Sequence, residues 1–108
     1  MSHERILTIY ESALQVTERM FTAARAGDWD SLVTLERERE RHVEEARSLE
    51  NGQAGPVALR ARKRELLQKI LARDEEIRIL TQDWMHELRE ILDSASNTQR
   101  LNRAYSQN

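Results

Sequence analysis

Two pairs of a carboxylate and a histidine are spaced so that both side chains of each pair lie on one face of a helix. Asp83 lies three residues before His86, and Glu38 lies four residues before His42. A metal site in a helical bundle also needs matching Glu or His ligands from other helices, and the sequence holds no counterpart of either pair. We interpret both as surface pairs and expect no metal and no cofactor.

Other catalytic chemistry lacks its usual residues as well. The sequence contains no cysteine, which excludes disulfides, thiolate zinc sites and thiol nucleophiles. It has no Gly-rich loop of the kind that cradles phosphate. It also offers no Ser, His and Asp residues that the sequence alone would support as a catalytic triad. We therefore expect that the chain is not an enzyme.

The densest basic cluster consists of Arg60, Arg62, Lys63 and Arg64. Glu65 follows it and no aromatic residue is interleaved, so stacking on single-stranded nucleic acid is not indicated. Over the whole chain 17 Lys and Arg residues stand against 19 Asp and Glu residues, for a formal net charge of −2, and we expect no direct contact with nucleic acid. No apolar run approaches the about 18 residues of a membrane span. We expect a cytoplasmic protein without membrane insertion.

Glycine and proline divide the 108 residues into three segments that each show helical periodicity. Gly27 stands where a left-handed helix C-cap belongs, and Asp28 follows as a candidate N-cap, which predicts a tight corner between antiparallel helices. Pro56 suits the first position of a third helix, and the run of weak helix formers from Ser94 to Thr98 predicts its end. The expected elements are helices over residues 3–26, 29–50 and 56–96 and a short tail over 98–106.

The predicted fold class is all-α, in a single domain over residues 1–108. It is an antiparallel bundle of three helices with a long third helix and a short C-terminal fourth segment. Charged residues interrupt its apolar stripes: Arg39 in the second helix, and Arg62-Lys63 and Asp74 in the third. Two interpretations of the charged run around Arg39, residues 36–42, remain open. It is either a solvated surface with ion pairs worth about 0.2–0.5 kcal/mol each, or a polar face that meets a partner.

The three helices differ in predicted length. At about 1.5 Å per residue the first two extend for about 35 Å and the third for about 60 Å, so the third must project beyond the bundle from about Leu80 onward. The projecting part carries the apolar residues Trp84, Met85, Leu88, Ile91 and Leu92. A contiguous apolar stripe of that size is rarely left to water in a soluble monomer, which predicts that something covers it.

Four arrangements would cover the stripe. A client protein could bind there in the helix-in-groove manner, or a second copy of the chain could pair with it in an antiparallel homodimer. The C-terminal tail could fold back so that Leu101 and Tyr105 mask it, in which case deleting residues 98–108 should strengthen client binding. Alternatively, a kink near Asp83 would let the third helix close its own bundle.

Four short motifs carry a resemblance to a known family. They are Ala26-Gly27-Asp28-Trp29-Asp30-Ser31-Leu32, Leu71-Ala72-Arg73-Asp74-Glu75-Glu76-Ile77, Met85-His86-Glu87-Leu88 and Asn97-Thr98-Gln99-Arg100-Leu101-Asn102-Arg103-Ala104-Tyr105. In order and spacing these motifs resemble those of the FliT-type flagellar export chaperones. The resemblance covers about residues 20–106, and the first and last motifs are its most specific parts.

The resemblance implies a small helical bundle that binds the filament-cap protein FliD in the cytoplasm and delivers it to the flagellar type III export gate. It also implies contacts with FlhA and the export ATPase complex, and, from some enteric members, antagonism of the transcription regulator FlhDC. Family members are thought to bind through an apolar surface of the second and third helices. The matching partner-binding positions here are Leu66, Ile70, Ile77, Leu80, Trp84 and Leu88.

Overall fold

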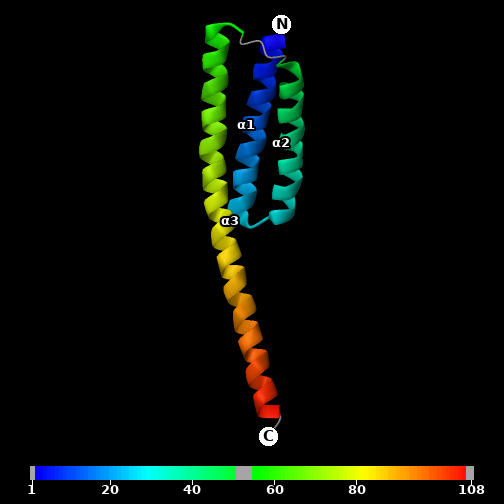
Figure 1. Cartoon of the computed structure of the whole chain (residues 1–108), viewed down its shortest axis with the longest axis vertical. Coiled ribbons are helices and arrows are strands. Elements are labelled where there is room, and N and C mark those ends of the chain that lie inside the picture. The colour runs from blue at the N-terminus through cyan, green and yellow to red at the C-terminus, as the bar shows by residue number, and fades with distance from the viewer. Residues whose placement is uncertain (1, 51–54, 107–108) are drawn as a thin grey trace.

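The computed structural model describes residues 2–50 and 55–106, with side chains described over 3–50 and 55–104. Within these ranges the chain is entirely helical, with α1 (Ser2–Ala26), α2 (Trp29–Leu49) and α3 (Val57–Ser106). α1 and α2 run antiparallel, α3 returns alongside α1, and α1 lies between the other two helices (Figure 1). The predicted all-α class and the three helices are confirmed.

α3 is longer than predicted, and the described residues contain no separate fourth segment. The helix continues through Asp83 and onward to Ser106, so the predicted break at about residue 96 and the kink that would close the bundle were both wrong. Ser, Asn and Thr cost a helix at most about 0.7 kcal/mol each, and the hydroxyl of Thr98 donates to the carbonyl of Ser94 at 3.0 Å within the helix. The molecule is therefore elongated, with extents of 78 × 22 × 20 Å.

The corner between α1 and α2 has the predicted chemistry. Gly27 adopts a φ of +69°, the left-handed conformation that glycine tolerates best. Asp28 then caps α2, since its carboxylate accepts hydrogen bonds from the hydroxyl of Ser31 at 2.6 Å and from its backbone amide at 3.2 Å. These two bonds hold the pKa of Asp28 below its ordinary value.

The core consists of two apolar clusters, and α1 contributes to both. The cluster nearer the corner contains Val16, Met20, Ala23, Ala24, Leu35 and Ile77. The cluster nearer the other end of the bundle contains Ile6, Ile9, Tyr10, Ala46 and Leu66. The stripes of all three helices therefore meet inside one chain.

A polar layer separates the two clusters. Arg39 of α2 forms an ion pair with Asp74 of α3 and also donates to the hydroxyl of Thr17, which is fully buried in α1. The side chain of Arg39 is only 19% exposed, so at this position neither a solvated surface nor a partner-facing group is found. Its neighbours Glu36, Arg37, Glu40 and Arg41 are exposed, as the solvated-surface interpretation of this charged run predicted. Arg39 and Asp74, which interrupt the stripes of α2 and α3, therefore neutralise each other. Such pairing is what makes a partly buried charge tolerable.

A second polar contact joins the helices at the end of the bundle away from the corner. The hydroxyl of Tyr10 donates to Glu50 at 3.1 Å, while the ammonium of Lys63 pairs with Glu50 and lies 5.5 Å from the centre of the Tyr10 ring. Burial, and then the neighbouring carboxylate, raise the pKa of Tyr10 to about 12.

This raised pKa predicts a loss of stability in alkali. Between pH 10 and about pH 12 the unfolded chain releases the phenol proton of Tyr10 while the folded chain retains it, so the free energy of unfolding should fall with rising pH, by up to about 2 kcal/mol. Urea unfolding of the wild type and of Tyr10→Phe at a series of pH values measures this effect. Because Tyr10→Phe keeps the pair between Lys63 and Glu50, identical pH slopes for both proteins would contradict the assignment.

Candidate functional site

Beyond the corner α3 continues alone, as Figure 1 shows. We call its residues 83–106 the overhang. They amount to about 36 Å of helix, and beyond Trp84 at its base neither α1 nor α2 lies beside it. An isolated helix of this length is only marginally stable in water, so the overhang gains from any partner that packs against it.

Trp84 marks the point where α3 leaves the bundle. Its ring lies edge-on to that of Trp29, with centroids 5.7 Å apart and an interplanar angle of 84°. It also covers the corner so closely that a Cβ atom at Gly27 would lie 2.8 Å from its Cζ2 atom. Gly27 therefore provides both a backbone conformation and the space for this indole.

This double role predicts the effect of substituting Gly27. Gly27→Ala should lower the free energy of unfolding by about 1–2 kcal/mol, because alanine is strained at positive φ, and should shift the tryptophan fluorescence as Trp84 moves. Gly27→Asn separates the two effects, since asparagine tolerates positive φ but still carries a Cβ. It should shift the fluorescence with a smaller loss of stability, and unchanged fluorescence in both variants would refute the close packing.

One face of the overhang is apolar and open to solvent. We call its five large residues the apolar stripe, and each is between 42% and 64% exposed. They are Trp84 (42%), Met85 (54%), Leu88 (49%), Ile91 (64%) and Leu92 (60%).

The apolar stripe continues the face of α3 that is buried inside the bundle. From Ile77 to Trp84, Leu88 and Ile91 the steps are seven, four and three residues, which keep the side chains on one side of an α-helix. Ile77 packs in the corner cluster with residues of α1 and α2, whereas the residues after the corner have no helix opposite them. The stripe thus has the character of a core-facing surface whose opposing helix is missing.

The six sequence-predicted partner-binding residues fall into two groups. Leu66, Ile70 and Ile77 are buried within the chain, so a partner could contact them only by displacing α1. Leu80 is half-buried against the corner cluster, whereas Trp84 and Leu88 belong to the exposed stripe. Met85, Ile91 and Leu92 share the stripe but were left out of the predicted set, although their spacing of three or four residues from Leu88 signals the common face.

Leu101, one of the two predicted masking residues, does not cover the stripe in this structure. Leu101 is 59% exposed in the uninterrupted helix, about a third of a turn away from the stripe. Tyr105 lies in α3, but its side chain is outside the described residues. Masking by this pair stays a prediction that would need a different conformation of the C-terminal end.

Charged groups on the overhang offer no catalytic or metal-binding arrangement. His86 pairs with Glu90 at 3.2 Å rather than with Asp83. Over the described residues, no three His, Asp or Glu side chains gather in a way that could hold a metal ion, and no helix combines the length and apolarity that crossing a membrane requires.

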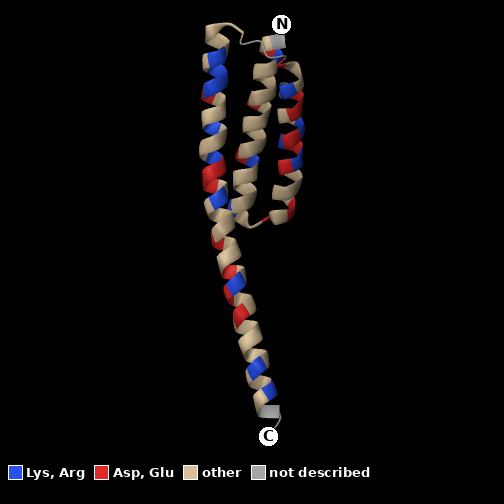
Figure 2. Ribbon diagram, in the orientation of Figure 1, with Lys and Arg blue, Asp and Glu red and all other residues tan. Residues whose placement is uncertain are grey.

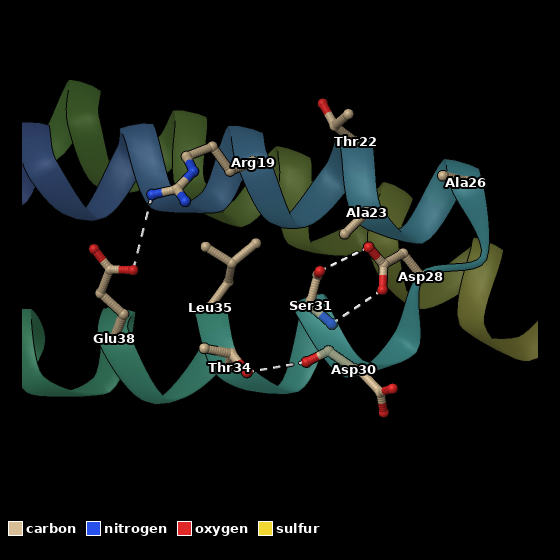
Figure 3. Close-up of a pocket in the computed structure, with 10 residues that line it drawn as sticks. All are labelled: Arg19, Thr22, Ala23, Ala26, Asp28, Asp30, Ser31, Thr34, Leu35 and Glu38. Atoms are coloured by element: carbon tan, nitrogen blue, oxygen red, sulfur yellow. Dashed lines mark hydrogen bonds and ion pairs between the residues drawn. The ribbon is translucent and has the colours of Figure 1, made fainter.

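A shallow groove runs between α1 and α2 near the corner (Figure 3). Ala23 and Leu35 form part of its lining, and its polar groups are already engaged with one another: Arg19 pairs with Glu38 at 3.8 Å, and Ser31 donates to Asp28. With Arg19, Glu38 and Asp28 engaged and its apolar lining small, this groove is a weaker candidate than the apolar stripe.

Similarity to known proteins agrees with this architecture. The sequence matches the family described as "Flagellar protein FliT" over residues 7–108. The chain belongs to the FliT family. This confirms the resemblance seen in the sequence, and FliT is a family of flagellar proteins rather than a class of enzymes.

Individual FliT proteins match along nearly the whole chain. The flagellar proteins FliT of Yersinia pseudotuberculosis serotype O:3 (strain YPIII) and of Yersinia enterocolitica are each 30% identical over 105 residues, covering 97% of this chain and 88% of theirs. The crystal structure of FliT from Bordetella bronchiseptica is 34% identical and superposes with a TM-score of 0.73, covering 80% of this chain and 97% of that one.

Proposed function

We propose that this FliT protein is a cytoplasmic export chaperone of the flagellar type III system, which binds the filament-cap protein FliD and delivers it to the export gate. The observation that carries the proposal is the apolar stripe, a core-like face of α3 without an opposing helix. Exposed apolar patches of this kind mark protein-binding sites, and an amphipathic helix of the client is the segment that best replaces α1 and α2 there.

The size of the stripe fits reversible binding. Complete burial of a large apolar side chain contributes about 1.5–3 kcal/mol, and the five residues are already about half buried. Covering them would contribute about 4–7 kcal/mol before the costs of association. A micromolar dissociation constant requires about 8 kcal/mol, so contacts of the client beyond the stripe must supply the remainder. The stripe therefore supports binding that is weak enough to be released, as a protein that hands its cargo onward requires.

Delivery needs partners besides the cargo. FlhA and the export ATPase complex are the proposed partners for this step, in agreement with the membership of the chain in a flagellar family. The bundle itself, with its many exposed ion pairs, leaves a polar surface available for such contacts while the overhang holds the client (Figure 2).

Calorimetric titration of the chain with the C-terminal segment of FliD from the same genome tests the cargo assignment. We expect saturable binding with a dissociation constant in the micromolar range. The absence of binding at tens of micromolar, for the full chain and for a chain shortened by residues 98–108, would refute the proposal.

A further inference from the structure

The flanks of the apolar stripe carry opposite charges. Asp83, Glu87 and Glu90 follow one another at intervals of four and three residues, so their carboxylates line one flank. Arg89 lies on the opposite flank by the same helical repeat. Figure 2 shows acidic residues, with a basic one among them, in the part of α3 that directly follows the bundle.

The acidic flank lacks the compensation that charges receive inside the bundle. There Arg73 pairs with Glu18 of α1 and with Glu76 of its own helix. On the overhang, neither Asp83 nor Glu87 has an ion-pair partner among the described residues, and Glu90 contacts only His86 of its own helix, at 3.2 Å. Like charges one turn apart repel each other, so a cation from outside the chain would relieve this repulsion.

We infer that the apolar stripe selects an amphipathic helix that carries Lys or Arg along the flank facing Asp83, Glu87 and Glu90, in preference to a second copy of this chain. The inference rests on the proposed function in that it specifies the client of the same surface. Apolar contact supplies the attraction, and the acidic flank decides which helices are accepted and in which orientation.

The same charges oppose self-pairing. In an antiparallel two-fold pair each flank of a helix meets the same flank of the other copy. A pair that buries stripe against stripe is centred near Leu88, so Glu87 of one copy would lie near Glu90 of the other, and Arg89 would lie near Arg89. A parallel pair is blocked by geometry, because α1 and α2 occupy the same face of α3 on the bundle side of Trp84.

Two synthetic peptides test the inference on the full chain. Both have the same length and the same leucine face, and they differ only in carrying Lys or Glu along one flank. At low salt the Lys peptide should bind about tenfold more tightly than the Glu peptide, and the difference should shrink towards zero in 0.5 M salt. In the charge-reversed variant Asp83→Lys, Glu87→Lys, Glu90→Lys, the preference should invert.

Each outcome separates the inference from the proposed function. Equal affinities in the wild type, or an unchanged preference in the reversed variant, would overturn the inference. Binding of the FliD segment with no binding of either peptide would also overturn it and leave the proposed function standing. Binding of the Lys peptide without binding of the FliD segment would refute the proposed function and leave the inference standing. A tight dimer in sedimentation whose stripe binds neither peptide would overturn the selection against a second copy.

Discussion

Leu88→Asp should weaken binding of the FliD segment by about 100-fold while changing the free energy of unfolding by less than about 1 kcal/mol. Leu88 lies at the centre of the apolar stripe, half exposed and outside both core clusters. A client that covers this position would lose an apolar contact and would bury an unpaired carboxylate, for a combined cost of about 2–4 kcal/mol. Calorimetric titration and urea unfolding measure the two quantities.

Leu71→Asp provides the matched control. Leu71 is also a leucine of α3 and is even more exposed, at 66%, but it lies on the bundle and off the stripe. The same substitution there should leave client affinity within about twofold of the wild type. Similar losses at both positions would show that binding responds to charge in general and would contradict a role for the stripe.

Leu66→Ala should lower the free energy of unfolding by about 2–5 kcal/mol, since Leu66 is 1% exposed and its truncation leaves a cavity between α1 and α3. Most domains of this size are stable by only about 5–15 kcal/mol, so the loss is a large fraction of the total. Urea unfolding measures this loss. Leu92 is 60% exposed, so Leu92→Ala is the control and should change the free energy of unfolding by less than about 0.5 kcal/mol.

The same pair of variants distinguishes core from client surface. At temperatures where it remains folded, Leu66→Ala should bind the FliD segment as the wild type does, whereas Leu92→Ala should bind it more weakly by about fivefold. A stable Leu66→Ala protein that no longer binds would place Leu66 on the client surface and would refute its assignment to the core.

Local signals in the sequence were sufficient to predict three helices and the corner between α1 and α2. Gly27 and Asp28 each occupy a cap position that few other residues suit, and the corner formed as predicted. The end of α3 was mispredicted because Ser94 to Thr98 lower helix propensity without forbidding the helix, and a weak local preference cannot set a boundary.

Contacts between distant segments were harder to predict. The helical period shows that Arg39 and Asp74 each interrupt a stripe, but it does not show that the two interruptions face each other across the bundle. Likewise, periodicity treats Leu66 and Leu88 alike, because both continue one apolar face. Only the position of the corner beside Trp84 separates residues covered by this chain from residues left for a partner.

Hydrogen exchange with and without the client tests the account most directly. In the free protein the amides of residues 84–95 should exchange faster than those of residues 66–77, because no other helix protects the overhang. Addition of the FliD segment should slow exchange across residues 84–95 by at least about tenfold and leave the bundle unchanged. Protection confined to α1 and α2, with the overhang still exchanging at its free rate, would contradict binding at the apolar stripe.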